Sequence, residues 1–319
     1  MGTYILRRLI MAVFILIIVT FIVFFVMQLL PGDPLVIFLG QQAGSGSMSQ
    51  EQIDQLYIRY GLDKPLMVQY WNWISGVVRG DMGESIYYHE EVSELLLERF
   101  PVTLDLGIKS FILYNILGIT LGMIAALRRG KWVDTVATLT SYFGVSIPVF
   151  WLGLLLIYAF GLKLDWFPIM GYTPIWEDLG RNLYESVMPV LCLSLMGWAT
   201  IARQTRSSVL EVISQDYIRT AWSKGLTERT VIMKHVLKNS LIPVITVMGI
   251  GLGLMFGGQV FIEQVFAIPG VGRLLVGSVF AQDYQVVQSA TLLIAAIVIF
   301  VNLLVDISYG WFDPRIRYN

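Results

Sequence analysis

Six long apolar runs, separated by polar and charged segments, dominate the pattern of residues along this chain. None of the runs contains a charged side chain, and each approaches or exceeds the roughly 20 helical residues that cross ~30 Å of hydrocarbon. The six predicted spans are residues 9–30, 110–127, 135–162, 186–202, 239–262 and 284–305. The pattern therefore predicts an all-α, polytopic membrane protein with six transmembrane helices.

The first apolar run follows Arg7 and Arg8, as the core of a secretory signal peptide would. Its 22 residues exceed the ~7–15 residues of such a core, and no small-residue cleavage site follows. We interpret this run as a retained membrane anchor.

Basic residues orient the six predicted spans. Fourteen Lys and Arg lie in segments on one side, including seven between Arg203 and Lys238, against seven in the loops on the other side. The positive-inside rule therefore places both termini in the cytoplasm.

The first loop, residues 31–100, carries ten Asp or Glu and four Lys or Arg, which predicts a small helical extracytoplasmic subdomain. Ser49 to Glu51 is typical of a helix start, and Gly61 and Pro65 predict a break. A flexible segment is expected at Gly44 to Ser47. The predicted organisation is residues 1–30 (cytoplasmic N-terminus and first helix), 31–100 (subdomain), 101–309 (five-helix core with a cytoplasmic loop at 203–238) and 310–319 (cytoplasmic tail).

Several residues within the spans predict how the helices bend and pack. Pro148 predicts a kink in the third span, and the second helix is expected to begin at Pro101. Glycines four residues apart predict close helix approach, at Gly118 and Gly122 and at Gly249, Gly253 and Gly257. Asp105 and Lys109 are i,i+4 partners, which we interpret as an ion pair that snorkels to the outer interface.

Composition agrees with a membrane protein, because 56% of residues are hydrophobic and 14% are charged. A net charge of −1 gives no sign of nucleic-acid binding. The chain has two His and one Cys, Cys192, so we expect no metal site, no cofactor and no catalytic residue. No phosphate-binding GxxxxGK[ST] motif occurs, so any ATP and magnesium must be bound by partner subunits.

The basic segment from Gln215 to Thr246 lies between two apolar spans. Its pattern predicts a helix, a tight turn at Gly225, and a second short helix that Thr227 caps and Glu228 favours. Such a rigid helix could fill a groove on a partner and transmit its motion. A loop that only holds topology and meets anionic membrane lipid remains the alternative.

The same segment resembles the cytoplasmic signature of ABC-importer permeases of the dipeptide/oligopeptide/nickel branch. The wider superfamily has Glu-Ala-Ala at positions 219–221 and a shorter gap to the later proline, and both departures resemble the peptide branch. The resemblance assigns ATPase coupling to Asp216, Tyr217, Arg219, Thr220, Ala221, Lys224, Gly225, Leu226 and Pro243.

Weaker matches extend the resemblance over the whole chain. They lie at residues 4–9, Pro31 to Pro34, 60–65, Ile268 to Arg273, and Asp313 to Tyr318. With these matches, the chain resembles the first of the two paired permease subunits of dipeptide and oligopeptide importers.

The resemblance implies a non-catalytic subunit, in the plasma or inner membrane of a prokaryote, that forms half of a translocation pathway. Its implied partners are a second homologous permease, two ATPase subunits, an extracytoplasmic substrate-binding protein and a peptide substrate. Import of nickel chelates or oligosaccharides by the same architecture is the alternative, and an ion channel using residues 268–279 is a remote one. Polar residues that could face the pathway, or form hydrogen bonds between helices instead, are Asn115, Ser141, Ser146, Gln259 and Asn302.

Overall fold

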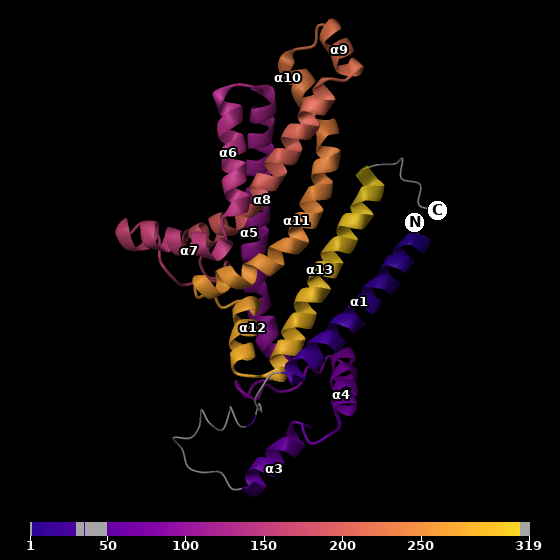
Figure 1. Cartoon of the computed structure of the whole chain (residues 1–319), viewed down its shortest axis with the longest axis vertical. Helices are drawn as coiled ribbons and strands as arrows, with labels where there is room; N and C mark the ends of the chain where they lie inside the picture. Colours follow the sequence, from indigo (N-terminus) through magenta and orange to yellow (C-terminus); the bar gives the residue numbers. More distant parts are fainter. Residues whose placement is uncertain (1, 30–34, 36–49, 313–319) are drawn as a thin grey trace. The chain divides into compact units, whose positions relative to one another are not determined.

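The computed structural model describes residues 2–29, 35 and 50–312, and within them the regular structure is helical (Figure 1). The only β-type pairing in these residues is an isolated bridge between Glu84 and Glu91. The all-α prediction is confirmed. Three sequence features lie outside the described residues: the Pro31 to Pro34 turn, the Gly44 to Ser47 segment and the Asp313 to Tyr318 tail.

The described residues form a series of helices in chain order. They are α1 (Gly2–Gln28), α3 (Gln50–Arg59), α4 (Leu66–Val78), α5 (Val92–Leu127), α6 (Trp132–Ser146), α7 (Val149–Leu156), the π-helix η1 (Ile157–Lys163), α8 (Leu179–Ile213), α9 (Asp216–Ser223), α10 (Glu228–Thr230), the π-helix η2 (Val231–Leu237), α11 (Lys238–Val265), α12 (Val271–Phe280) and α13 (Tyr284–Phe312).

Four of the described helices are long and apolar enough to cross a membrane, namely Leu6–Gln28, Val92–Leu127, Glu228–Val265 and Tyr284–Val305. Two further candidates are bent pairs. Trp132–Gly144 and Val149–Lys163 meet at 105°, and Leu179–Leu195 and Gly197–Ile213 meet at 47°. The described residues therefore provide six spans when each bent pair counts as one.

The bend in the third span occurs where Pro148 predicted it. Helix α6 ends at Ser146, and Pro148 is the residue before the first turn of α7. Proline is favoured at the start of a helix, because an N–H group there would have no acceptor within the helix. The result is a complete break rather than a kink within one helix.

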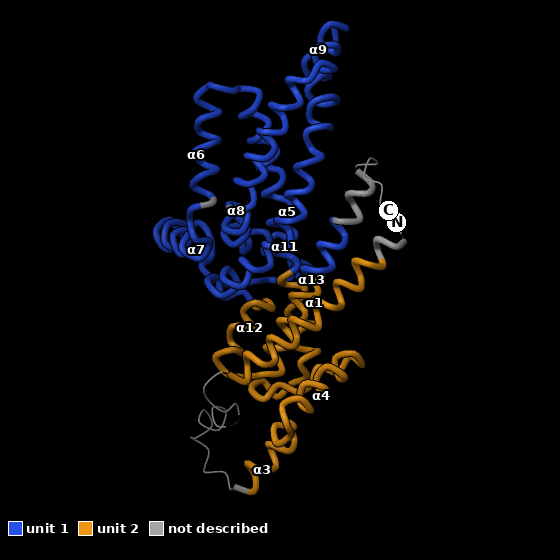
Figure 2. The backbone as a smooth tube through the Cα atoms, turned by 45° about the vertical axis from the view of Figure 1, so that its right-hand side comes forward, with its two compact units in different colours: residues 1, 104–268, 298–319 blue, residues 2–103, 269–297 orange. Residues whose placement is uncertain are grey.

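The chain divides into two compact units, which Figure 2 colours separately. Unit 1 comprises residues 1, 104–268 and 298–319, and unit 2 comprises residues 2–103 and 269–297. Each unit has buried apolar clusters of its own.

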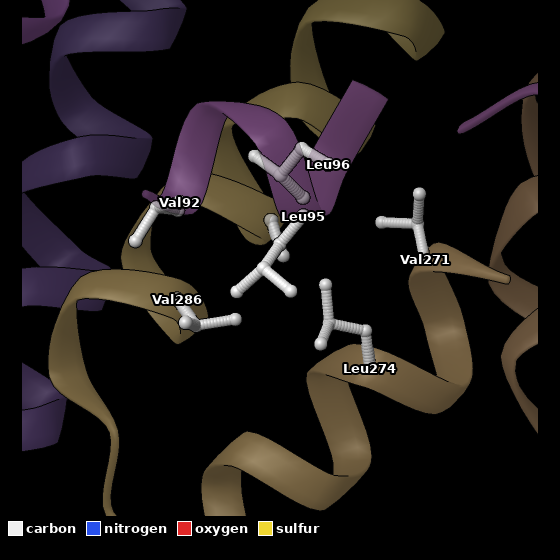
Figure 3. Close-up of a cluster of buried hydrophobic side chains, with 7 residues drawn as sticks. Val92, Leu95, Leu96, Val271, Leu274 and Val286 are labelled. Carbon is white, nitrogen blue, oxygen red and sulfur yellow. The ribbon is translucent and has the colours of Figure 1, made fainter. Parts of the chain in front are cut away.

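Unit 2 contains helices α3 and α4 together with α1, α12 and the first turns of α5 and α13. The predicted break is confirmed, because Gly61 has φ +67° and Pro65 precedes α4. One apolar core of this unit joins the starts of α5 and α13 to α12, as Figure 3 shows. Its buried residues are Val92, Leu95, Leu96, Val271, Leu274, Val286 and Ala290.

The same core explains why helix α5 begins earlier than expected. The predicted start at Pro101 is wrong, since the helix begins at Val92 and includes Pro101. A proline inside a helix costs about 3 kcal/mol. Burial of Val92, Leu95 and Leu96 offsets this cost, because each fully buried aliphatic side chain contributes about 1.5–3 kcal/mol.

Unit 1 is built around α5, α6, α8 and α11. A Cβ at Gly122 would lie 2.5 Å from the Ala202 carbonyl oxygen, so α5 and α8 can approach closely only with glycine there. Gly249 meets the side chain of Val305 in the same way. Gly257 differs from the prediction, because an added Cβ would meet no atom within 4 Å.

Candidate functional site

Helix α9 lies at one end of unit 1, beyond the ends of the long helices α8 and α11 (Figures 1 and 2). It has eight residues, Asp216–Ser223, and a bend at Ser214 and Gln215 separates it from α8. This is the end that the basic residues assign to the cytoplasm. The predicted coupling segment therefore forms a discrete helix at the tip of the unit.

The inner face of α9 is apolar. Ile218 and Ala221, three residues apart and therefore on one helix face, are 1% and 6% exposed. They pack into a cluster of buried residues from α5, α8 and η2, namely Ala126, Val209, Val231 and Val236. The inner face of α9 is therefore in direct contact with α5, α8 and η2.

The outer face of α9 is charged and open. Asp216 and Arg219 are 95% and 76% exposed, and the 3.5 Å contact between them is an ordinary surface ion pair. Such pairs contribute about 0–1 kcal/mol, so either group can exchange its partner at little cost. Thr220 and Lys224 are exposed on the same helix and its end.

Tyr217 and Asn239 connect α9 to the start of α11. The Asn239 side-chain amide donates a hydrogen bond of 3.2 Å to the Tyr217 hydroxyl, and a second of 2.7 Å to the His235 carbonyl. Helix α9 is therefore held by two contacts: the hydrogen bond at the Tyr217 hydroxyl and the apolar packing of Ile218.

Gly225 forms the turn that follows α9. Its φ is +74°, a region that side-chain-bearing residues rarely adopt, and an added Cβ would meet no atom within 4 Å. The requirement for glycine therefore comes from the backbone, not from lack of space. The left-handed turn predicted at this position is confirmed.

The helix after this turn differs from the expectation. Thr227 does precede a helix, but its hydroxyl pairs with the Thr230 hydroxyl at 2.8 Å rather than with a backbone amide. The predicted second helix does begin after the turn, at Glu228, but it is not short, because α10, η2 and α11 follow one another directly as far as Val265. The short, separate helix is α9, on the N-terminal side of the glycine.

The remaining coupling candidates do not all share the α9 surface. Leu226 is exposed beside Gly225, but Ala221 is buried and faces the apolar cluster. Pro243 lies inside α11 and not on α9.

A salt bridge that sequence spacing could not reveal supports the same end of unit 1. The Arg206 guanidinium donates to both carboxylate oxygens of Asp134, at 2.6 and 2.9 Å. Asp134 also accepts from the Gly130 amide at 3.0 Å. The two charged residues are 72 positions apart, so only the fold shows that this pair ties the α5–α6 turn to α8.

The five pathway candidates differ in burial. Ser146 and Asn302 are exposed, whereas Asn115, Ser141 and Gln259 are buried. Three of them donate to the backbone carbonyl four residues earlier in their own helix: Asn115 at 2.7 Å, Ser141 at 2.8 Å and Ser146 at 2.9 Å.

The Asp105–Lys109 pair is present but has a different setting from the one expected. The Lys109 ammonium lies 2.6 Å from Asp105, and the two side chains are only 15% and 10% exposed. Snorkelling to the interface is therefore wrong for this pair. Lys109 also donates to Asn182 and Ser186 of α8, because these side chains face α5 at the same level.

The loop before α8 completes this buried network. The Tyr172 hydroxyl donates to Asp105 at 2.8 Å, and Asn182 donates to the Thr173 carbonyl at 2.8 Å. Burial, with the hydrogen bond to Asp105, raises the pKa of Tyr172 above its ordinary value. The network joins α5, α8 and this loop.

Comparisons with known proteins cover the full chain. Residues 118–318 match the family model of the binding-protein-dependent transport system inner membrane component, and residues 1–107 match the model of its N-terminal region. A Brucella abortus (strain 2308) protein, named as a peptide transport system permease, is 40% identical over 319 residues, covering 100% of both chains. The oligopeptide transport system permease protein AppB of Bacillus subtilis (strain 168) is 39% identical over 321 residues, again covering 100% of both.

A solved structure shares the fold of part of the chain. The inward-facing MetNI methionine ABC transporter aligns with a TM-score of 0.55 at 18% identity, covering 69% of this chain and 96% of that one.

Proposed function

The chain belongs to the family of binding-protein-dependent transport system inner membrane components, and we propose that it forms half of the translocation pathway of an ATP-driven peptide importer. Its likeness to peptide permeases from end to end supports this cargo. Membership in the family implies ATPase and binding-protein partners. A second, homologous permease would complete the pathway.

The exposure and packing of α9 support the proposal that this helix contacts the ATPase subunits. Its charged outer face is exposed in this chain, while Ile218 and Ala221 connect its inner face to α5, α8 and η2. A surface that is held rigidly beneath and left open above can transmit a partner's movement into the spans. This two-sided arrangement is the single observation that carries the coupling proposal.

In the proposed cycle, closure of the ATPase pair moves α9, and the cluster around Ile218 transmits this movement to α8 and the helix from Glu228 to Val265. The pathway then opens outward and receives peptide from the binding protein. A ligand can bias the two conformations only by its different affinity for each.

The cargo is tested by reconstituting the chain with its second permease, ATPases and binding protein in vesicles. We expect ATP-dependent uptake of short peptides, with no uptake of a nickel chelate or an oligosaccharide. Peptide uptake by the isolated chain, driven by a proton gradient, would contradict the proposal.

The contact is tested by crosslinking the complex through a Thr220→Cys variant. The native Cys192 is 1% exposed, so it leaves little background. We expect a crosslink to an ATPase subunit. A Trp132→Cys variant, exposed at the start of α6, is the control for general proximity at this end of unit 1. Equal crosslinking at both positions would argue against a specific α9 contact.

A further inference from the structure

A cavity of about 140 Å³ lies within unit 1, among α5, α7, α8 and α11. Its lining side chains are apolar except for Tyr114 and Thr200. Ile250 and Leu254 of α11 line it and are themselves exposed, so the cavity reaches the surface of this chain. None of the five pathway candidates lines it.

Tyr114 carries a buried polar group in this apolar wall. The residue is 2% exposed, and its hydroxyl has no partner in hydrogen-bond geometry in the described part of the chain. The polar side chain beside it is Asn115, whose amide donates to the Phe111 carbonyl instead. Leaving a buried hydroxyl without a partner is unfavourable, because the group loses its hydrogen bonds to water and gains none in return. Its retention therefore needs an explanation.

Two glycines make room for this tyrosine. A Cβ at Gly197 would lie 2.6 Å from the Tyr114 ring, and one at Gly251 would lie 3.2 Å from the hydroxyl oxygen. Both glycines also line the cavity. The position of the hydroxyl is therefore fixed by α8 and α11 from two sides.

The cavity is located where two spans are broken. Val149, the first residue of α7, follows the 105° break, and Gly197 follows the 47° bend in α8. Transporters place substrate sites where discontinuous helices expose an irregular backbone near the membrane midplane. Gly251 is close to the middle of the predicted span at residues 239–262, which agrees with this depth.

We propose that the cavity receives one apolar side chain of the peptide cargo and that the Tyr114 hydroxyl donates a hydrogen bond to a main-chain carbonyl of that peptide. The inference rests on the proposed peptide cargo. An apolar cavity of about 150 Å³ accommodates a benzene ring, so this one fits a phenylalanine or leucine side chain. A lipid acyl chain could fill the space, but it offers no acceptor at the midplane for the hydroxyl.

Two adjacent glycines of α11 provide a matched pair of variants. Gly258 lines the cavity and Gly257 does not, and an added Cβ at either meets no atom within 4 Å. Gly258→Leu should fill the cavity, whereas Gly257→Leu adds the same bulk outside it. The assay is ATP-driven uptake of trialanine and of alanyl-phenylalanyl-alanine by the complete transporter, with binding protein saturated by each peptide.

We expect Gly258→Leu to lower uptake of the phenylalanine peptide relative to trialanine by about tenfold. Burial of a phenylalanine side chain strengthens binding by at least about that factor, and the variant removes the space for it. Gly257→Leu should leave the ratio unchanged. An unchanged ratio in Gly258→Leu, or an equal change in both variants, would overturn the inference. Failure of the wild-type complex to import either peptide would overturn the proposed function instead.

Tyr114→Phe gives an independent test that adds no bulk. If the hydroxyl does not contact the cargo, its removal should leave transport unchanged. Thermal stability should rise, because a buried polar group without a partner is removed. We expect a severalfold fall in uptake of both peptides, with equal or higher stability. Unchanged uptake would contradict the hydrogen bond to cargo, and so would a loss of uptake accompanied by loss of complex stability.

Discussion

Charged residues serve opposite purposes in two regions of unit 1. On α9, the side chains of Asp216 and Arg219 are largely exposed and form a surface ion pair with each other. In the buried network of Asp105, Lys109 and Asn182, the charges are satisfied within the chain by direct hydrogen bonds. Exposed, weakly paired charge is available to another subunit, whereas buried, fully paired charge holds helices and a loop in place. The same residue types therefore form the proposed docking surface on α9 and the buried clamp between α5, α8 and the loop before α8.

The largest expected effect is on the clamp. Lys109→Met leaves the Asp105 carboxylate buried without its cation, and breaking a buried pair in this way costs about 3–5 kcal/mol. We expect a large fall in the thermal stability of the purified complex. Arg219→Met, the same change at an exposed ion pair, is the control. Equal stability of the two variants would mean that burial does not distinguish the regions.

The next effect concerns the turn that orients α9. Gly225→Val forces a β-branched residue into a left-handed conformation, at a cost of about 1–3 kcal/mol. We expect insertion to persist and peptide-stimulated ATPase activity to be lost, because the following chain must change direction. The measurements are membrane yield, ATPase retention and ATP turnover.

Gly130→Val is the matched control for that strain. Gly130 has φ +75° and open space around it, in the turn between α5 and α6. Its variant should cost similar stability while retaining coupling. Wild-type uptake in Gly225→Val would return the loop to a topological role, and uncoupling by both variants would show that strain alone is responsible.

Asp283 of unit 2 is a buried carboxylate whose hydrogen-bond donors are uncharged. It is 1% exposed and accepts from the Ser85 hydroxyl and the Tyr87 amide. Burial raises its pKa above the ordinary carboxyl value. Its folded form therefore binds the proton more tightly than its unfolded form does.

The sign of the pH effect follows from this shift. The contribution of Asp283 to stability is complete below the ordinary carboxyl pKa of about 4, and it is lost as pH rises through the raised folded value. We expect Asp283→Asn to remove this dependence from melting curves of the purified complex recorded upward from about pH 4. A wild-type profile in the variant would contradict the assignment.

The sequence predicted the parts that depend on local pattern. Apolar runs located the spans, Pro148 marked the break in the third, and Gly225 marked the left-handed turn. It failed where tertiary contacts decide, because the core around Leu95 extends α5 past Pro101.

The candidate site shows the same division. The motif at residues 216–226 contains the α9 surface, but burial of Ala221 and the contact between Asp134 and Arg206 depend on helices distant in sequence. The spacing of Asp105 and Lys109 revealed their pairing, yet their burial depends on two α8 side chains that lie 73 and 77 positions beyond Lys109. The Tyr114 cavity left no local signal, since it forms only where four helices meet.

The smallest expected change in stability is on the outer face of α9, in Arg219→Ala. The side chain is 76% exposed and its ion pair with Asp216 is 3.5 Å long, so its loss should alter stability by less than about 1 kcal/mol. The same change removes a charge from the proposed ATPase contact, and we therefore expect weaker ATPase retention that depends on salt concentration. Arg59→Ala, which breaks an exposed pair with Glu84 in unit 2, is the control that should leave ATPase retention unaltered. The measurement is ATPase copurification at low and high salt beside a melting curve. ATPase retention equal to wild type at both salt concentrations would show that α9 does not bind its partner through this charge. A large fall in melting temperature would show that Arg219 stabilises the fold, as the buried Asp105–Lys109 pair does.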